Sequence, residues 1–329
     1  MTSERMRIGP PILRIRNIDT VLAFYENMLG LQAKKRYQDR DEEQGKDNDS
    51  NSNLFYELGF KNKESLSSSA SHEPLIILKH DATARIPSPC SAGLFHFAIL
   101  VPDRRSLAST YIALRNSGVQ YDGFADHLVS ESLYFRDPEN NGIEIYRDRP
   151  SSEWPRDNNG NIVMDTLPLD LNSLLSEMSV NDNEEKNNAK AFPTGAKIGH
   201  MHLKVTNLKR SIKFYQEKIG LDITVDWSSM GATFLSAGGR YHHHIAINTW
   251  YSLNGESHMI GEDAGLETFT LITPDNSYIN GLAQRIHGSP FSSATTNSRQ
   301  ATGNQILVSD PDKIQFMIRS GFRGTKIGM

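Results

Sequence analysis

Hydrophobic and polar residues alternate at two places along the chain, and the same signals follow in both. Residues 8–30 read IGPPILRIRNIDTVLAFYENMLG, and residues 198–220 read IGHMHLKVTNLKRSIKFYQEKIG. Each begins with the period of two that is typical of a half-buried strand. Each then passes through a short turn into a segment that carries Phe-Tyr on one helical face and ends at glycine. The pattern therefore predicts a strand followed by a helix in both segments.

Two weaker copies of this pattern occur elsewhere in the chain. Residues 94–119 and 267–289 again read as strand, Pro-Asp turn, helix and glycine. Short apolar runs after each helix predict further strands, such as SLYFRDP and GIEIYRD in the second copy. A repeat of this kind indicates that one supersecondary unit occurs four times along the chain. The units have the order β-α-β-β-β and lie near residues 8–80, 94–148, 197–249 and 266–320.

A single unit would leave one face of its small sheet uncovered, so two units side by side are expected to form a curved sheet with a concave pocket. We predict an α+β fold of four βαβββ modules in two paired-module domains with curved mixed sheets. Residues 1–149 would hold modules 1 and 2, and residues 196–329 modules 3 and 4. Residues 150–195 contain one short helical stretch and a run of Asn, Glu and Lys, which predicts a partly disordered linker. Polar insertions occupy residues 39–53 and 61–73.

Composition narrows the class of protein. The 329 residues are 37% hydrophobic and 9% aromatic, enough for two globular cores, and the net charge of -4 gives no general attraction to nucleic acid or anionic lipid. Cys90 is the only cysteine, which excludes an intrachain disulfide and a thiolate metal site and suits a reducing cytosol. Neither a secretory signal nor a membrane span is expected, because no apolar run approaches the ~20 residues that a bilayer requires. A cytoplasmic location is therefore expected.

The Phe-Tyr and Leu-Gly pattern of the first unit, together with DPENNGIEIYRDRP at residues 137–150, resembles the vicinal-oxygen-chelate superfamily, which includes glyoxalases, bleomycin resistance proteins and extradiol dioxygenases. Within this superfamily the chain is similar over most of its length to two-domain bacterial catechol 2,3-dioxygenases. The insertions and the long linker depart from that pattern. The resemblance implies a mononuclear metal held by two histidines and one glutamate, which leaves coordination positions open.

The resemblance places each ligand in the repeat. One histidine stands on the first strand of a unit in IGH-x-x-L-x-V, here His200, and another stands in H-x-A, here His96. The glutamate closes DP-x-x-N-x-x-E, here Glu144. The equivalent places in the first and fourth units hold residues that are poor ligands for Fe(II), namely Pro10, Thr268 and Met317.

These positions predict which units share a pocket. His96 and Glu144 belong to the second unit and His200 to the third, so a complete triad requires units two and three to face one another. The common extradiol arrangement instead takes all three ligands from units three and four. An alternative pairing of units one and two would leave two ligands, with Pro10 at the third corner. We favour the pairing of two with three because it alone completes the triad.

The resemblance also implies catalytic side chains. Tyr134 matches the tyrosine that hydrogen-bonds the bound catecholate, although a half-buried strand tyrosine would look the same. The H-x-x-A pattern selects His243 as the catalytic histidine, and we favour it, whereas strand alternation around Ile245 would turn His242 and His244 toward the pocket and keeps His244 as the alternative. His127 is a candidate for orienting a ligand or the substrate. His202 is expected in the pocket wall, and two further aromatic residues either line the entrance or merely pack, namely Trp250 and Tyr251.

The function that the resemblance implies is extradiol cleavage of catechol or a substituted catechol by O₂ at Fe(II), in aromatic hydrocarbon catabolism. The expected partners are an aromatic diol and O₂, with no nucleic acid or membrane. Pairing of exposed strands leaves open a homo-oligomer. Two other functions remain open: a glyoxalase-like isomerase or lyase that uses Ni or Zn, and a non-catalytic protein that binds a small molecule in the cup.

Overall fold

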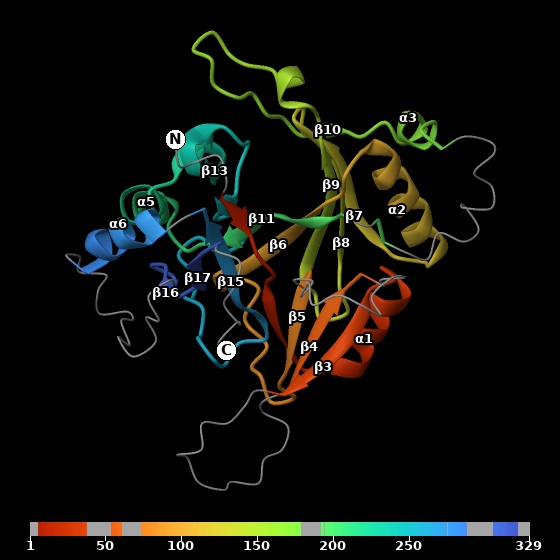
Figure 1. Ribbon diagram of the computed structural model, residues 1–329, viewed down its shortest axis with the longest axis horizontal. Coiled ribbons are helices and arrows are strands. Elements are labelled where there is room, and N and C mark those ends of the chain that lie inside the picture. The colour runs from red at the N-terminus through yellow and green to blue at the C-terminus, as the bar shows by residue number, and fades with distance from the viewer. Residues whose placement is uncertain are drawn as a thin grey trace, which may run out of the picture.

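The computed structural model describes residues 6–37, 54–60, 74–178, 192–193, 195–274, 276–287 and 305–321 (Figure 1). Two mixed β-sheets run through the described part of the chain, and helices cover their outer sides. The α+β fold with curved mixed sheets is therefore confirmed. The predicted insertions at 39–53 and 61–73 lie outside the described residues.

One sheet, called here sheet 2–3, takes its strands from the second and third units. Its strand order is β10-β7-β8-β9-β6-β11-β14-β13-β12. The antiparallel pair β6–β11 joins the two units at its centre, as the sequence predicted. The strands are β6 (Gly93–Leu100), β7 (Tyr121–Asp126), β8 (Ser130–Arg136), β9 (Gly142–Asp148), β10 (Leu167–Pro168), β11 (Lys197–Lys204), β12 (Asp222–Trp227), β13 (Ala232–Ser236) and β14 (Ile245–Asn248).

The other sheet, sheet 1–4, takes its strands from the first and fourth units. Its order is β16-β17-β15-β2-β5-β4-β3, with β1 also paired to β15. The strands are β1 (Arg7–Ile8), β2 (Ile12–Ile15), β3 (Gln32–Tyr37), β4 (Leu54–Gly59), β5 (Ile76–His80), β15 (Gly265–Thr273), β16 (Gln305–Ser309) and β17 (Gln315–Ser320). The remaining strand expected for the fourth unit would fall at residues 288–304, outside the described residues.

The helices begin where polar side chains can accept from free backbone N–H groups. Asn17, Asp103 and Asn207 cap α1, α2 and α5 by accepting from the N–H three residues further on. The helices are α1 (Ile18–Asn27), α2 (Arg104–Asn116), α3 (Leu171–Leu175), α5 (Leu208–Phe214) with a π-helical turn at Tyr215–Ile219, α6 (Asn276–His287) and 3₁₀ turns at Ser151–Glu153, Ser228–Met230 and Ala237–Gly239.

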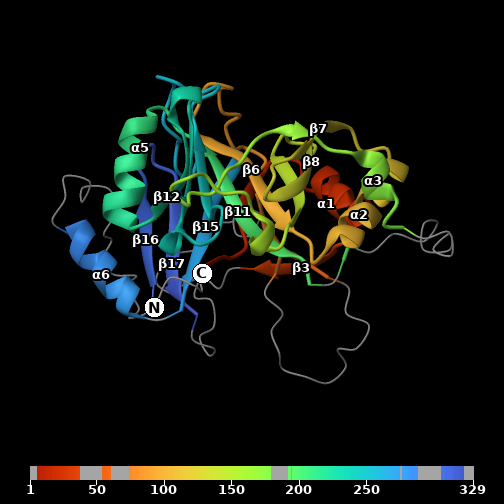
Figure 2. The same ribbon diagram turned by 90° about the horizontal axis from the view of Figure 1, so that it is seen from above.

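The helices gather in two groups that cross the division between the sheets. Figure 2 shows α1, α2 and α3 on one side of the molecule and α5 and α6 on the other. Buried tyrosines tie the units within each group: Tyr25 of α1 donates to Asp137 of the second unit over 3.2 Å, and Tyr215 donates to Asp310 of the fourth over 3.2 Å. Helices thus link units one with two and three with four, whereas sheets link two with three and one with four. The division into residues 1–149 and 196–329 stays a prediction.

The first part of the predicted linker packs against sheet 2–3. Residues 150–178 are described, and β10 extends sheet 2–3 by pairing with β7. Trp154, Ile162 and Met164 are buried against Phe234 and its apolar neighbours. The segment is therefore a packed wall of the molecule, because its scattered apolar residues find a sheet face to cover. In the rest of the predicted linker, residues 179–191 and 194 lie outside the described residues.

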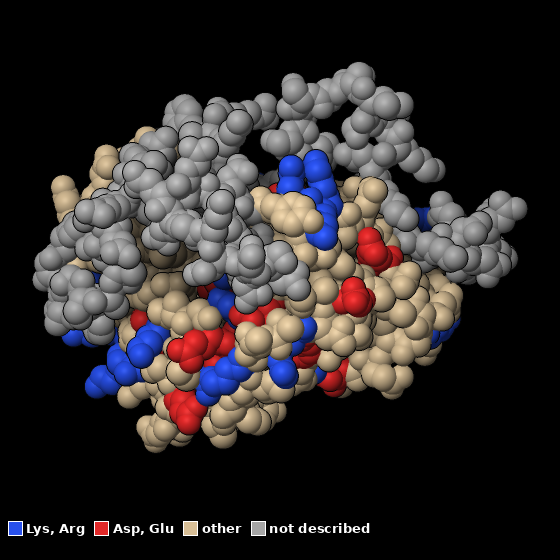
Figure 3. Space-filling model, turned by 90° about the horizontal axis from the view of Figure 1, so that it is seen from below, with Lys and Arg blue, Asp and Glu red and all other residues tan. Residues whose placement is uncertain are grey.

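The surface agrees with the balanced charge of the sequence. Figure 3 shows one face, on whose described part Lys and Arg side chains are interspersed with Asp and Glu. That part of the face forms no extended basic surface of the kind that binds phosphate backbones. Among the described residues, no helix is long and apolar enough to cross a membrane.

Candidate metal centre

The register of sheet 2–3 brings the predicted ligands to one face. Tyr134 pairs with Glu144 across β8 and β9, Glu144 pairs with Ala98 across β9 and β6, and Ala98 pairs with His200 across β6 and β11. His96 lies two residues from Ala98 on the same face and pairs with His202. The small side chain of Ala98 therefore stands in the middle of the row, where it leaves space between the larger polar groups.

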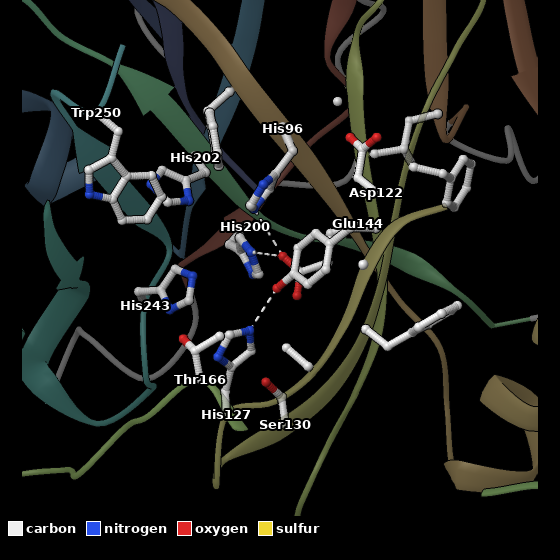
Figure 4. Close-up of a pocket in the computed structure, with 18 of the residues that line it drawn as sticks. His96, Asp122, His127, Ser130, Glu144, Thr166, His200, His202, His243 and Trp250 are labelled. Carbon is white, nitrogen blue, oxygen red and sulfur yellow. Dashed lines mark hydrogen bonds and ion pairs between the residues drawn. The ribbon is translucent and has the colours of Figure 1, made fainter. Parts of the chain in front are cut away.

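Three ligand atoms converge on that space. The Nε2 atoms of His96 and His200 each lie 2.9 Å from Oε2 of Glu144, and the ligand atoms of all three residues lie within 4.8 Å of one another. The side chains are buried, with exposures of 6%, 2% and 2% for His96, His200 and Glu144. Figure 4 shows them pointing toward one another beneath a ring of further histidines. In the described part of the chain, this is the only group of three such residues with metal-binding geometry.

Electrostatics favour the deprotonated ligands that a metal ion needs. Burial alone would raise the pKa of Glu144, but electrostatic attraction to His200 and His96, together with the hydrogen bond from His200, holds that pKa well below its ordinary value. Burial lowers the pKa of His200 to about 4, because the charged ring is poorly solvated there. The other oxygen of Glu144, Oε1, accepts from the hydroxyl of Ser132 over 2.6 Å. Oε2 is therefore left facing both imidazoles.

The arrangement fits a divalent cation. When two ligand atoms each lie about 2.1 Å from the same ion and the ligand–ion–ligand angle is a right angle, the two atoms are about 3 Å apart. The two 2.9 Å separations at Oε2 match that spacing. The Nε2 of His96 is buried and, among the described residues, has no hydrogen-bond partner, so it offers a lone pair that an ion would satisfy. Two histidines and one carboxylate form the ligand set of the facial triad.

The triad lies in the wall of a cavity of about 530 Å³. Most of its other lining is apolar or aromatic, including Phe124 and Phe234, and the predicted wall residue His202 also lines it. Trp250 and Tyr251 are 46% and 64% exposed and line the same cavity, as expected for entrance residues. Sequence reasoning did not identify Met164 and Thr166, which reach the cavity from the segment interpreted as a linker.

Tyr134 and His127 form a hydrogen-bonded pair beside the triad. His127 Nδ1 lies 2.8 Å from the carbonyl oxygen of Asp165, so this nitrogen carries the proton and donates it. In the neutral ring, Nε2 then accepts from the Tyr134 hydroxyl, 2.7 Å away. Burial and the nearby Glu144 carboxylate raise the pKa of Tyr134 well above its ordinary value, so its hydroxyl stays protonated.

The three consecutive histidines have separate environments. His243 lines the cavity, and its ring centroid lies 4.1 Å from that of His200. His244 does not line the cavity: its Nε2 contacts the carbonyl oxygen of Met6 at 3.0 Å and its Nδ1 contacts Ser236 at 3.0 Å. The alternative of His244 as the catalytic residue is therefore unsupported by the geometry. Strand alternation misled at this point because β14 begins only at Ile245.

Sheet 1–4 repeats the register but not the ligands. Thr270 of β15 pairs with Met317 of β17, just as Ala98 pairs with Glu144 in sheet 2–3. Thr268 of β15 pairs with Ile12 of β2, just as His96 pairs with His202. These pairs support the predicted equivalence of Met317 with Glu144 and of Thr268 with His96.

Comparisons with known proteins agree with this geometry. The family model for the Glyoxalase/Bleomycin resistance protein/Dioxygenase superfamily matches residues 7–145 and 197–318. The chain is 35% identical over 313 residues to a catechol-2,3-dioxygenase of Bacillus subtilis (strain 168), covering 94% of this chain and 96% of that protein. It is also 36% identical over 61 residues to biphenyl-2,3-diol 1,2-dioxygenase 3 of Rhodococcus globerulus, which is 18% of this chain and 32% of that protein.

Solved structures share the fold at low sequence identity. A putative dioxygenase from Bacillus subtilis subsp. subtilis str. 168 superposes with a TM-score of 0.60 at 14% identity, over 98% of this chain and 87% of that one. Glyoxalase I from Zea mays superposes with a TM-score of 0.52 at 14% identity, over 96% and 92%. From the family match over most of its length, the chain belongs to the Glyoxalase/Bleomycin resistance protein/Dioxygenase superfamily.

Proposed function

We propose that this protein is an extradiol ring-cleaving dioxygenase that acts on catechol or a substituted catechol with O₂ at one Fe(II), held by His96, Glu144 and His200. The observation that carries the proposal is the convergence of two imidazole nitrogens and one carboxylate oxygen, at two separations of 2.9 Å, in the wall of an aromatic cavity. The catechol-2,3-dioxygenase to which the chain is 35% identical supports the choice of reaction.

The iron would supply a Lewis acid that binds both the diol oxygens and O₂. The chain's own contribution begins with the cavity, whose aromatic walls hold the ring and exclude water. Tyr134 and His127 form one polar side of that cavity. A proton gained by His127 at Nε2 would reverse their hydrogen bond and free the Tyr134 hydroxyl to donate to a substrate oxygen.

His243 forms the opposing polar side. It faces the cavity next to His200 and is 4% exposed, so it can take a proton from a substrate hydroxyl without competition from bulk water. Burial lowers the pKa of His243 well below its ordinary value, so the ring is neutral before the substrate binds.

The size of the cavity favours a substituted ring. A benzene ring fits a dry cavity of roughly 150 Å³, and this cavity is about 530 Å³. The additional space extends to exposed aromatic residues at the entrance, Trp250 and Tyr251. An apolar substituent on the catechol would cover these residues while the diol remains at the ligands.

The ligand number bears on the rival reactions. A glyoxalase-like isomerase would be favoured by a fourth protein ligand that closes the site. The described residues provide a group of three, which leaves positions for substrate and O₂. A non-catalytic binding protein would not need buried, convergent ligand atoms. Iron as the metal, a cytoplasmic location, a role in aromatic catabolism and the oligomeric state stay predictions.

The test is to reconstitute the full chain anaerobically with Fe(II), add catechol and 3-substituted catechols, and then admit air. We expect consumption of O₂ together with a yellow ring-cleaved product, and loss of both in His200→Ala. Bound iron with no O₂ consumption on any of these diols would reject the proposal.

A further inference from the structure

We propose that Asp148 and His242 are positioning residues that fix the tautomer of His243, so that its Nε2 faces the cavity without a proton. Asp148 was not predicted as a site residue, and His242 entered only as a residue that strand alternation would turn toward the pocket. The catalytic importance of this tautomer rests on the proposed function. The hydrogen bonds between Asp148, His242 and His243 do not depend on that function.

The three side chains form a continuous chain of hydrogen bonds. Asp148 is the last residue of β9, four positions after Glu144. Its Oδ1 lies 2.9 Å from Nε2 of His242, and Nδ1 of His242 lies 2.7 Å from Nδ1 of His243. His242 is completely buried and His243 is 4% exposed, so water does not substitute for these partners.

The positions of the protons follow from what each atom can do. A carboxylate only accepts, so Nε2 of His242 carries a proton and donates it to Asp148. In a neutral ring this leaves Nδ1 of His242 with a lone pair. The 2.7 Å contact between the two Nδ1 atoms needs one proton, which His243 must then supply. The proton of neutral His243 is thereby held at Nδ1, and Nε2 is left as the basic nitrogen.

Asp148 is itself held by the hydroxyl of Tyr241, which in turn is held by the hydroxyl of the buried Tyr146. Its Oδ2 accepts from Tyr241 over 3.0 Å, and the oxygen of Tyr241 accepts from Tyr146, 2.7 Å away. Burial, together with Asp148, raises the pKa of both tyrosines well above the ordinary value, so both remain donors. These contacts fix the carboxylate in the orientation that His242 requires.

Gly199 makes this arrangement possible. A Cβ atom at this position would lie 1.8 Å from the hydroxyl oxygen of Tyr146, so any larger residue would displace the tyrosine. The glycine of the IGH motif therefore has a second role beside the ligand His200: it provides the space in which Tyr146 supports the chain through Tyr241 to Asp148.

The direct test is a ¹⁵N–¹H correlation spectrum of the full chain labelled at histidine, with His242→Gln and His243→Gln variants for assignment. Without metal or substrate, we expect His243 as the Nδ1–H tautomer and His242 as the Nε2–H tautomer. An Nε2–H tautomer of His243 in the native protein would overturn the proposal. This readout needs no turnover, so the hydrogen-bonded chain can stand even where the proposed dioxygenase activity fails.

A variant tests the consequence for catalysis. Asp148→Leu should give a mixed tautomer at His243 and lower kcat roughly 10- to 100-fold, with the KM for catechol and the affinity for Fe(II) nearly unchanged. The matched control is Asp126→Leu. Asp126 is 24% exposed, close to the 22% of Asp148, but it pairs with Arg149 and takes no part in the hydrogen bonds between Asp148, His242 and His243. A native tautomer and native kcat in Asp148→Leu, or an equal loss of kcat in Asp126→Leu, would contradict the positioning role.

Discussion

Sheet 2–3 and sheet 1–4 use the same strand register for opposite purposes. In sheet 2–3 the register aligns Tyr134, Glu144 and His200 on one face beside a cavity. In sheet 1–4 the corresponding face holds Met317 and Thr268, neither of which suits a hard cation. The fold therefore supplies the frame of a metal site twice, and a few side chains decide whether that frame can bind.

Sheet 1–4 carries a different polar feature on its strands. Arg14 is 5% exposed and binds Asp81 and Glu267, and Lys79 binds the second oxygen of Glu267 at 2.7 Å. Opposite charges here satisfy one another through hydrogen bonds, whereas in the described part of sheet 2–3 the Nε2 of His96 lies 2.9 Å from Glu144 without forming a hydrogen bond. The comparison indicates that one sheet uses buried charge for stability and the other keeps it available for an ion.

The largest difference is expected from matched substitutions at equivalent positions. His96→Ala should weaken Fe(II) binding more than about 100-fold, because a ligand itself is lost rather than a group that orients one. Thr268→Ala, at the equivalent position of sheet 1–4, should leave iron binding unchanged. Iron content after anaerobic gel filtration measures both. Equal iron retention in the two variants would remove the basis for distinguishing the sheets.

A stability effect is expected in the opposite sheet. Glu267→Gln leaves Arg14 and Lys79 short of a partner and should lower the free energy of unfolding by about 2 kcal/mol. Because Glu267 lies in sheet 1–4, kcat and iron content per folded chain should stay native. Urea unfolding combined with the oxygen assay checks both values. Lost activity with unchanged stability would assign this network a functional role instead.

A smaller effect is expected from the substituent on the substrate. Covering about 55 Å² of apolar surface at the entrance is worth about 1.4 kcal/mol, or tenfold in affinity. A catechol with an apolar 3-substituent should therefore have a KM about tenfold below that of catechol. Trp250→Ala should remove most of this preference while leaving the KM of catechol itself unchanged. Equal KM values in the native enzyme would exclude the entrance as part of the substrate site.

The smallest effect concerns the buried aspartates that bind the helix tyrosines. Burial, with Asp312 nearby, raises the pKa of Asp310 to about 7. Because this folded-state pKa lies above the ordinary value of 3.8, the stability that Asp310 contributes is complete below pH about 4 and is lost as the pH rises through about 7. Native protein should thus be less stable at pH 8 than at pH 6 by up to about 1 kcal/mol, and Asp310→Asn should reduce this difference.

Thermal unfolding at both pH values measures this difference in stability, with Asp137→Asn as the counterpart from the second unit. A pH dependence that is unchanged in Asp310→Asn would contradict this assignment.

Much of the frame could be predicted from the sequence because its signals are local and repeated. Period-two strands, polar residues before the helices and a glycine after them recur in the units. The positions of the expected ligands predicted that the second and third units would share a pocket. The equivalence of Met317 with Glu144 followed from the same alignment, and the strand register supports it.

What could not be predicted depends on contacts between distant segments. Met164 and Thr166 come from a segment without strong periodicity, so nothing local indicated that they would reach the cavity. Asp148 and His242 meet only because β9 lies close to the loop before β14. The alternation argument for His242 and His244 has a related weakness, since alternation applies only within a strand and β14 begins at Ile245.

The most direct measurement is the fate of ¹⁸O₂ in the presence of the Fe(II)-loaded protein and a catechol, followed by mass spectrometry of the product. An extradiol dioxygenase cleaves the ring carbon–carbon bond adjacent to the diol, and both atoms of one O₂ molecule enter the product. We therefore expect a hydroxymuconic semialdehyde that contains two ¹⁸O atoms, formed by the native chain and not by His200→Ala. Unchanged catechol with iron bound, or a dicarboxylic muconate from cleavage between the hydroxyl groups, would contradict the proposed function.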